Sequence, residues 1–552
     1  MKTYTIGVDF GSLSCRAVLL DTANGKELAS ATAAYAHAVM DERLAKTKEV
    51  LPPNYALQDP ADYIEALATV LPQVIAKAGV DKREVVGIGI DFTCCSMLPV
   101  KEDGTPLCFN PAFADNKHAY VKMWKHHAAQ KYADRINEVA RARGEKWLMM
   151  AGGNVSSEFM FPKIYQTLDE APEVYHAAYT FVEAGDFINW QLTGKPCCSY
   201  RFAAYKSQFS YEEGYPTEEF FAAVDERLRF VVRDKLPFPV SPAGTEVGRV
   251  SVAAAEKFGL AEGTVVAAAC PDAHVAASAM NVCHNGDAFA IFGTSACFYV
   301  LDTALYDVAG ICGVAKDGVT NGFYGYEAGL CCFGDHFAYA AENLASPAYV
   351  KQAQERGISL LQLLSERAAE LPAGKSGLIA LNWWNGNRSI LGNSDLSGAF
   401  VGMTLQTSPA DMMRALFEAT AFGTRRIFEA FGDSGVPVRR LMAAGGIAGK
   451  NPFLMQLFAD ILGVEIRVAE TAEASAHGAG VGAAVAAGVF ADFPSAMAHM
   501  ADPGKQVYVP SDKDRAVYDA LYREYCRLYD YFGKGENNVM KRLRQIAARS
   551  GE

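Results

Sequence analysis

One short pattern occurs twice in the sequence, about half a chain apart, and it limits the possible folds more than any other feature. Residues 5–20 form an apolar run, the turn Phe10-Gly11-Ser12-Leu13-Ser14 and a second apolar run. Residues 287–302 repeat this order around Phe292-Gly293-Thr294-Ser295. Apolar β-rich runs on both sides of a turn with Gly and hydroxyl residues predict a β-hairpin. The repeat therefore indicates two related domains, each opening with such a hairpin.

Length and the order of the remaining elements agree with two α/β domains. A chain of 552 residues is too long for one ordinary hydrophobic core. Residues 60–77 have helical spacing, whereas 85–91 and 264–272 are predicted to be buried strands that end on an acid. A helix is expected over 273–280. Strands that alternate with helices predict an α/β fold.

The expected domains are residues 1–245, residues 246–512 and a helical tail over 513–552 that packs on the second domain. The crossover is placed at Leu236 to Val250, which is rich in Pro and Gly. The tail has an apolar face made of Tyr518, Leu521, Tyr525 and Leu528.

Charge and cysteine usage exclude several classes of protein. The formal net charge of -12 repels nucleic-acid backbones and anionic lipid, so neither is an expected partner. The first residues do not have the pattern of a signal peptide, and no run of 18 apolar residues is present. The 13 cysteines are scattered and form no C-x-x-C, which is typical of a reducing compartment. A cytoplasmic protein is expected.

The two hairpin turns have the chemistry of phosphate-binding loops. In the first turn, Gly11 lets the backbone approach an anion, and Ser12 and Ser14 supply hydroxyl donors. Asp9, at the end of the preceding strand, could hold Mg²⁺ through water. The second turn offers the same donors from Gly293, Thr294 and Ser295. The alternative for the first turn is a plain hairpin with a capping Asp, but two such loops facing one another would hold a triphosphate.

A third Gly-rich segment follows a predicted strand near residue 442. Gly445 and Gly446 leave bare backbone against which a flat ring can lie, and Asn451 is a natural N-cap for the helix that follows. That helix is expected to end at Gly463. The segment is not a Walker P-loop, because Ala444 stands where Gly is required and Asn451 follows Lys450.

Asp272 lies between the strand predicted over 264–272 and the helix that follows. A carboxylate at this place could accept a proton from a substrate hydroxyl. From position alone, an ordinary N-cap aspartate explains it equally well.

These motifs resemble those of the FGGY carbohydrate kinases, and the resemblance covers essentially the whole chain. The segments that carry it are Asp9 to Ser12, Val86 to Asp91, Gly293 to Cys297, Gly310 to Gly313, Glu327 to Gly329, Phe333 to Asp335, Trp384 to Gly386 with Arg388, Gly445 to Ile447, Lys450 with Asn451, and Gly478 to Gly482. The length, 552 residues, is more similar to that of family members that act on ribulose than to that of the somewhat shorter members that act on xylulose or glycerol.

The resemblance implies two actin-like (ribonuclease H-like) ATPase domains with an active-site cleft between them. It implies ATP and Mg²⁺ as cofactors, with Asp9 toward the metal and Asp272 as the catalytic base. Gly11, Ser12 and Ser14 match the first phosphate motif, Gly293 to Ser295 the second, and Gly445, Gly446 and Asn451 the adenosine motif. Sugar contacts would fall on Cys94, Cys95, Trp124, Lys206, Asp272 and Glu327. Trp124 as plain core and Lys206 as a solvated side chain stay open as alternatives.

Three places depart from the family pattern. The family often has Trp-x-Asp-x-Arg near Trp124, but here Lys125, His126 and His127 follow. Asn387 stands where many relatives have Glu, and the pair Cys94–Cys95 replaces smaller or polar residues. His126 and His127 are expected on different faces of a helix, lining the pocket or the surface, and no histidines form a metal-ligand set.

The implied reaction is ATP-dependent phosphorylation of L-ribulose to L-ribulose 5-phosphate in L-arabinose catabolism. D-ribulose, ribitol, xylulose and glycerol remain alternative substrates, because spacing does not show the configuration of a hydroxyl. A remote alternative is an actin-like ATPase that binds other proteins, but no appended peptide-binding domain follows Leu462. A homodimer is compatible with the resemblance.

Overall fold

The computed structural model describes residues 2–471 and 473–549, and contacts divide the chain into two compact units. The first unit extends to Cys283 and includes 313–325 and 473–502. The second contains 284–312, 326–471 and the chain from 503 onward.

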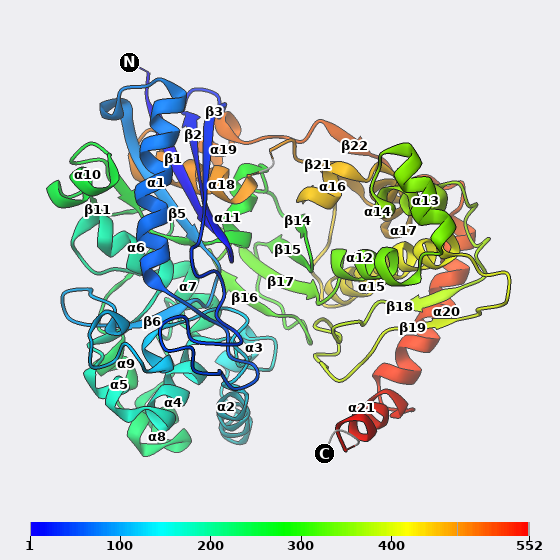
Figure 1. Cartoon of the computed structure of the whole chain (residues 1–552), viewed down its shortest axis with the longest axis horizontal. Helices are drawn as coiled ribbons and strands as arrows, with labels where there is room; N and C mark the ends of the chain where they lie inside the picture. Colours follow the sequence, from blue (N-terminus) through cyan, green and yellow to red (C-terminus); the bar gives the residue numbers. More distant parts are fainter. Residues whose placement is uncertain (1, 472, 550–552) are drawn as a thin grey trace. The chain divides into compact units, whose positions relative to one another are not determined.

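The secondary structure alternates between strands and helices in both units (Figure 1). The first unit contains β1 (Tyr4–Phe10), β2 (Ser14–Asp21), β3 (Glu27–Ala34), β4 (Leu57–Gln58), α1 (Pro60–Ala78), η1 (Lys82–Glu84), β5 (Val85–Phe92), β6 (Met97–Val100), η2 (Leu107–Phe109), η3 (Lys117–Ala119), β7 (Val121–Lys122), α2 (Gln130–Arg143), α3 (Trp147–Met150), α4 (Met160–Glu170), α5 (Pro172–Ala177), β8 (Thr180–Glu183), α6 (Ala184–Thr193), β9 (Cys198–Ser199), α7 (Tyr200–Lys206), α8 (Glu218–Val224), η4 (Glu226–Leu228), α9 (Val231–Lys235), β10 (Val240–Ser241), β11 (Glu246–Arg249), α10 (Val252–Phe258), β12 (Val265–Ala267), β13 (Cys270–Pro271), α11 (Asp272–Ala279), β16 (Gly313–Lys316), α18 (Ala474–Ala486) and α19 (Phe493–Met500). The second unit contains β14 (Asp287–Phe292), β15 (Ala296–Asp302), β17 (Tyr324–Leu330), α12 (Gly334–Leu344), α13 (Pro347–Arg356), α14 (Leu360–Ala369), β18 (Ile379–Leu381), β19 (Ala399–Val401), α15 (Pro409–Asp433), β20 (Arg440–Ala444), α16 (Gly446–Lys450), α17 (Pro452–Leu462), β21 (Glu465–Val468), β22 (Gln506–Tyr508), α20 (Arg515–Gly533) and α21 (Val539–Arg549).

The main sheet of the first unit has the order β11-β12-β5-β1-β2-β3, with β13 also pairing with β5. β1 and β2 form the predicted antiparallel hairpin, and β1 lies parallel to β5. Because β11, β12 and β13 belong to this sheet, the first unit runs past the boundary expected at residue 245. The predicted strand over 264–272 consists of two short strands, and α11 begins at Asp272 itself.

Helices pack on both faces of this sheet. Side chains alternate along β1, so Val8 and Phe10 join the apolar core with Tyr63 of α1. α1 packs along β2 and β3, as Figure 1 shows. Gly7 points to the other face, where a methyl group in place of its hydrogen would lie 1.7 Å from the Ala476 carbonyl oxygen of α18. Glycines in β1 and β5 therefore let the backbone of α18 lie directly on the sheet.

A second, smaller core completes the first unit. The strands β4-β7-β6-β8 form a separate sheet, and α2, α4, α5 and α8 pack together beside it. Its buried residues include Met97, Tyr120, Ile136, Ile164 and Phe221.

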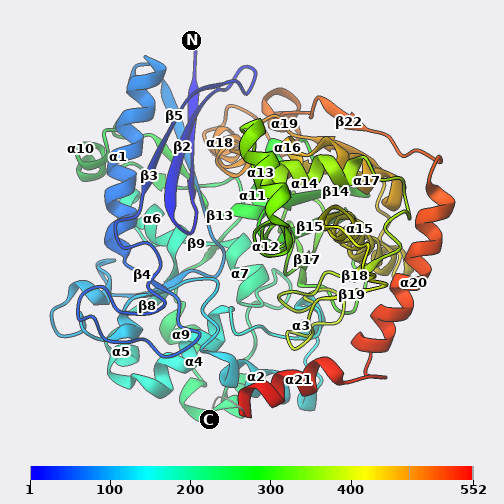
Figure 2. The same cartoon turned by 45° about the vertical axis from the view of Figure 1, so that its right-hand side comes forward.

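The second unit repeats the arrangement of the first. β14 and β15 form an antiparallel hairpin, and β14 lies parallel to β20, as β1 does to β5. The order of strands is β17-β15-β14-β20-β21-β22, and α15 and α17 lie beside this sheet in Figure 2. The predicted repeat of two hairpins is confirmed at the level of topology.

The carboxyl-terminal helices α20 and α21 belong to the second unit. α20 buries Tyr518, Tyr522, Tyr525 and Tyr529 against this unit, so Tyr522 and Tyr529 are buried in addition to the two predicted tyrosines.

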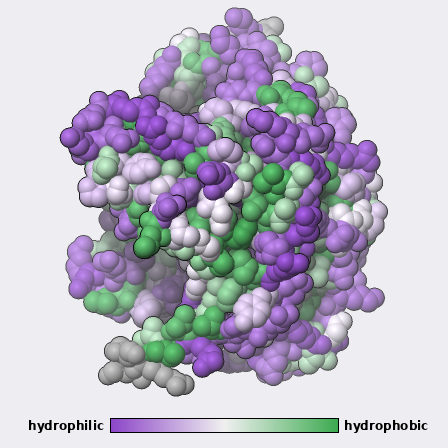
Figure 3. All heavy atoms as spheres, turned by 90° about the vertical axis from the view of Figure 1, so that its right-hand side faces the viewer, coloured by the Kyte–Doolittle hydropathy of each residue, from purple (hydrophilic) through white to green (hydrophobic). Residues whose placement is uncertain are grey.

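Exposed apolar side chains, including Leu405 and Leu543, lie on the second unit, and Figure 3 shows apolar side chains gathered on one face. None of the helices within 2–471 and 473–549 is long and apolar enough to cross a membrane.

Candidate functional site

Three aspartates of the first unit converge at one edge of its main sheet. Asp9 is the next-to-last residue of β1, and its neighbour in the parallel register is Asp91 near the end of β5. β13 pairs with β5 so that Cys270 lies opposite Asp91, and Asp272 follows directly at the start of α11. The carboxyl ends of parallel strands are where open α/β sheets bind ligands. The strand register thus brings Asp9, the predicted metal-binding residue, and Asp272, the predicted base, to the same edge of the sheet.

The surroundings of Asp91 and Asp9 shift the pKa values of these two carboxyl groups to different extents. Asp91 is fully buried, and burial, followed by the charge of Asp9, raises its pKa well above the ordinary value. Burial also raises the pKa of Asp9, while Asp91 and Arg16 act in the opposite direction. Arg16 lies 3.6 Å from Asp9. Of the two carboxyl groups, Asp91 is therefore the one whose protonated form is favoured more, and Asp9 is the better anion.

Asp272 is the first residue of α11 and is half-buried. It is not the N-cap, because that position is Pro271. Its Oδ1 accepts a hydrogen bond of 2.7 Å from the Ala273 backbone N–H. A carboxylate at a helix N-terminus is favoured in its ionised form by the helix dipole, as a proton acceptor requires.

The first phosphate turn is held by the residues around it. The Gly11 N–H donates to the Ser14 carbonyl oxygen at 3.0 Å, and the Gln58 side-chain amide donates to the Ser12 carbonyl oxygen at 2.9 Å. Trp124 Nε1–H donates to Ser12 Oγ at 3.1 Å. Trp124, a predicted sugar-binding residue, is therefore directly hydrogen-bonded to Ser12, a predicted phosphate-binding residue.

The other predicted sugar residues of the first unit include two adjacent cysteines and a lysine that acts on them electrostatically. Cys94 is half-buried and Cys95 is buried, and the charge of Lys206 acts on the pKa of both thiols, although burial is the largest influence. Lys206 is the last residue of α7 and only 7% exposed, with Nζ 5.0 Å from the ring centroid of Phe159. Lys206 is thus not the solvated side chain of the alternative reading.

The two histidines after Trp124 do not lie on a helix, which corrects the expectation from the sequence. They occupy a turn that precedes α2. His126 is fully buried: its Nδ1 accepts from the Ala56 N–H, and its Nε2 is 2.9 Å from Gln166 Oε1. His127 is exposed and lies 2.9 Å from Glu158. His126 therefore fixes the turn, because its ring nitrogens are both used within the protein.

In the second unit, the second predicted phosphate turn, Gly293 to Ser295, is hydrogen-bonded to the start of α12. The Gly293 N–H donates to the Ser295 carbonyl oxygen at 3.0 Å, which repeats the contact made by Gly11. The Phe333 N–H donates to the Thr294 carbonyl oxygen at 2.8 Å. Gly293 and Thr294 are exposed, so the Thr294 hydroxyl is accessible to a ligand.

The predicted adenosine segment lies beside this turn. β20 pairs with β14, and Gly445, with φ of 102°, has no room for a side chain because a methyl group would lie 2.4 Å from the Phe292 carbonyl oxygen. Gly446 faces open space. Asn451 caps α17 as predicted, accepting from the Leu454 N–H at 3.0 Å, and Gly463 ends that helix in a left-handed conformation. A short helix, α16, was not predicted between them.

Gly446→Ala is expected to raise KM for ATP about tenfold without lowering Tm, because the new methyl group would occupy the surface predicted for the adenine ring. Gly449→Ala is the matched control, since Gly449 also lies in α16 and also faces open space. Steady-state kinetics and thermal melting of both variants check the prediction. Equal values of KM for ATP in the two variants would contradict the adenosine assignment.

The last predicted sugar residue, Glu327, lies on β17 and is 8% exposed. β17 neighbours β15, the strand that follows the second phosphate turn. Within the described ranges, no group of three or more His, Cys, Asp or Glu side chains is arranged to hold a metal ion. Asp9, the predicted Mg²⁺ partner, supplies a carboxylate, a donor type that Mg²⁺ prefers.

Both halves of the chain match one protein family. Residues 4–279 match the N-terminal domain and residues 288–487 the C-terminal domain of the FGGY family of carbohydrate kinases. This chain belongs to the FGGY family. It is 45% identical over 538 residues to a ribulokinase of Bacillus licheniformis, covering 97% of each chain. It is 46% identical to a ribulokinase of Halalkalibacterium halodurans, covering 98% of this chain and 97% of that one.

Solved FGGY-like structures have the same fold at low sequence identity. A ligand-bound xylulose kinase from Lactobacillus acidophilus has a TM-score of 0.78 at 19% identity, over 97% of this chain and 99% of that chain. A glycerol kinase from Plasmodium falciparum bound to ADP has a TM-score of 0.75 at 16% identity, over 95% and 98%. The predicted fold class is therefore confirmed.

One residue of the candidate site, Asp91, was not predicted as a functional residue. Its sequence signal is the pair Asp91-Phe92, which copies Asp9-Phe10. In the structure the two phenylalanine rings stack at 5.0 Å.

His336, in the first turns of α12, makes the second unit sensitive to acid. It is 1% exposed, its Nε2 is 3.1 Å from Thr420 Oγ1, and burial lowers its pKa to about 3. The unfolded chain binds a proton near pH 6.5 and the folded one does not, so stability falls as pH drops below that value. Through His336, the wild-type protein is expected to lose about 2 kcal/mol of its free energy of unfolding between pH 7 and pH 5. The His336→Gln variant is expected not to show this part of the loss. Urea unfolding at both pH values checks this, and an unchanged pH dependence would contradict it.

Proposed function

We propose that this FGGY kinase transfers the γ-phosphoryl group of ATP to the C5 hydroxyl of L-ribulose, the reaction of an L-ribulokinase. The observation that carries the proposal is the similarity to ribulokinases at 44–46% identity, from one end of the chain to the other. The positions of the acids in the first unit are compatible with this chemistry.

In the proposed reaction, Asp272 accepts the proton of the C5 hydroxyl as the C5 oxygen attacks the γ-phosphorus. The bond between the γ-phosphorus and the bridging oxygen breaks, and ADP leaves with that oxygen. Burial raises the pKa of Asp91, which disfavours a second negative charge beside Asp272. Transfer through a loose transition state depends mainly on positioning and charge.

Each unit would supply one hydroxyl-bearing turn for the phosphates: Gly11 to Ser14 in the first and Gly293 to Ser295 in the second. Gly445, Gly446 and Asn451 would hold the adenosine. Mg²⁺, when bound with ATP, would offset phosphate charge, with Asp9 as its partner through water. That all these groups serve one active site remains the prediction made from the sequence.

The sugar would be bound by Cys94, Cys95, Trp124, Lys206 and Glu327 together with Asp272. Lys206 is the only cation in this set and would donate to sugar hydroxyls. A cytoplasmic location and a role in L-arabinose catabolism follow from the same proposal, and a homodimer stays open.

Product analysis tests the proposal. Incubation with Mg-ATP and L-ribulose is expected to give one sugar phosphate, with ³¹P–¹H coupling to the two C5 protons. A product phosphorylated on another carbon would place the wrong hydroxyl beside Asp272 and overturn the proposed geometry.

A further inference from the structure

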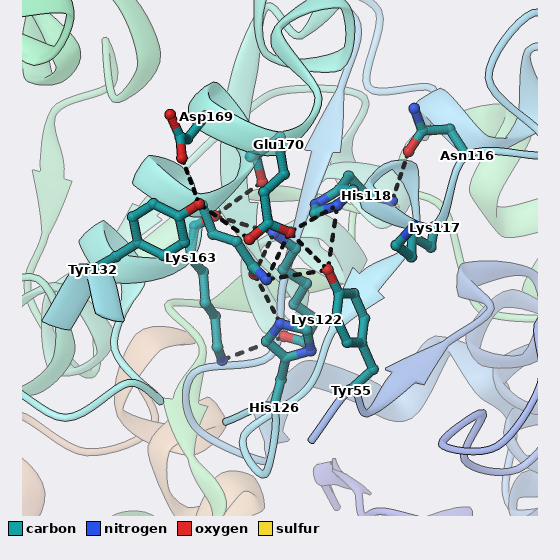
Figure 4. Close-up of polar contacts among 12 residues, drawn as sticks. Tyr55, Asn116, Lys117, His118, Lys122, His126, Tyr132, Lys163, Asp169 and Glu170 are labelled. Atoms are coloured by element: carbon teal, nitrogen blue, oxygen red, sulfur yellow. Dashed lines mark hydrogen bonds and ion pairs between the residues drawn. The ribbon is translucent and has the colours of Figure 1, made fainter. Parts of the chain in front are cut away.

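A buried lysine of α4 joins two turns that carry predicted sugar residues. The Lys163 side chain is fully buried. Its Nζ donates to the carbonyl oxygens of Cys95 at 2.5 Å, Met123 at 2.9 Å and Lys122 at 3.5 Å. An ammonium group has three N–H donors, so each can face one carbonyl oxygen. Figure 4 shows Lys163 beside the segment that carries His126.

The two carbonyl groups with the shortest contacts belong to Cys95 and Met123, and the first of these residues has a backbone conformation that needs support. Cys95 has φ of 64°, in the left-handed region that residues other than Gly rarely adopt. Such a conformation persists only when its surroundings hold it. Met123 directly precedes Trp124, whose indole N–H reaches Ser12 Oγ. One amine thus contacts both the Cys94–Cys95 turn and the residue before Trp124.

A neighbouring lysine provides a contrast. Lys122 is equally buried, but its Nζ donates to the Lys163 carbonyl oxygen, to Gln166 Oε1 at 2.9 Å and to Thr167 Oγ1 at 2.7 Å, all on α4. It therefore anchors β7 to α4 without touching either turn carbonyl. Burying an amine is costly, and an apolar side chain of similar volume fills such space with less desolvation. The position of the Lys163 amine consequently points to a task beyond filling the core.

We propose that Lys163 is a positioning residue for sugar binding. Its amine fixes the Cys94–Cys95 and Met123–Trp124 turns relative to each other, so that Cys94 and Trp124 meet the sugar in a preset geometry. A misplacement of about 1 Å in such a site can cost a large part of the activity. The identity of the sugar rests on the proposed function, whereas the link between the two turns does not.

The test compares Lys163→Met with Lys122→Met, since each removes one buried amine and keeps an unbranched stem. Lys163→Met is expected to raise KM for L-ribulose at least about tenfold, with KM for ATP within about twofold. It is also expected to speed amide hydrogen exchange over residues 93–97 and 122–126 about tenfold. Lys122→Met is expected to change neither the sugar KM nor the exchange of residues 93–97.

Several outcomes would overturn the proposal. Unchanged exchange at both turns would show that Lys163 does not hold them, and faster exchange with an unchanged sugar KM would show that the turns need no such support. Equal effects in both variants would reduce Lys163 to a general contributor to stability. If Lys163→Met does not fold, Lys163→Leu, which also lacks N–H donors, replaces it, and wild-type exchange and sugar KM in that variant would have the same meaning. If the wild-type protein phosphorylates no sugar, the proposed function fails, while the exchange comparison still decides the role of Lys163.

Discussion

Replacing Asp272 with asparagine is expected to lower kcat about 10²–10⁴-fold, the usual contribution of a general base. Asparagine keeps the shape of the side chain and an oxygen that can accept from the Ala273 N–H, but it cannot take up a proton. Because the proposed role of Asp272 concerns the sugar hydroxyl, KM for ATP is expected to change by less than about twofold.

Steady-state kinetics with Mg-ATP and L-ribulose measure this effect, and thermal melting shows whether the variant folds. The slow hydrolysis of ATP without sugar serves as an internal control, since it does not use the C5 hydroxyl. A variant with near wild-type kcat would remove Asp272 from the role of base. An equal loss of sugar-dependent and sugar-independent turnover would indicate damage to ATP binding instead.

Gly478→Ala is expected to cause a large loss of stability. Gly478 lies where α18 crosses α11, and a methyl group there would be 2.1 Å from the Val275 carbonyl oxygen. Backbone must move to admit it, at a cost of about 3 kcal/mol or more. Because α11 begins with Asp272, the same movement is expected to lower kcat. The expected fall in Tm is at least about 5 °C.

Gly482→Ala is the matched control in the same helix. A methyl group at Gly482 would lie 3.7 Å from the ring of Phe493, an ordinary contact, and alanine favours helix by about 1 kcal/mol over glycine. This variant is expected to melt no lower than the wild type. If both variants had the same Tm, the close approach of α18 to α11 would not be a determinant of stability.

Local patterns predicted the parts of the fold that depend on a few adjacent residues. The hairpins at residues 5–20 and 287–302 and the α17 helix from Pro452 to Leu462 all form as expected. Their signals are chemical and local: Gly with hydroxyl residues in a turn, Asn451 as an N-cap, and Gly463 as a left-handed stop. The repeat of the hairpin also predicted the shared topology of the two units.

Features that depend on pairing between distant segments were not predictable from the sequence. The boundary between the units lies beyond residue 245 because β12 and β13 pair with β5. The same pairing brings Asp91 to Asp272. His126 is buried beside Gln166 of α4, a hydrogen-bond partner that lies 40 residues away in the sequence. Lys163 is recognisable only when the carbonyl oxygens of both turns are seen around its amine.

The substrate is decided most directly by ADP release from purified protein with Mg-ATP, measured as kcat/KM for L-ribulose, D-ribulose, D- and L-xylulose, ribitol, L-arabitol and glycerol. L-ribulose is expected to give the highest kcat/KM. A higher value for another polyol or ketose would contradict the substrate while leaving the kinase reaction intact. The absence of stimulation by any of these compounds would contradict the proposed kinase activity itself.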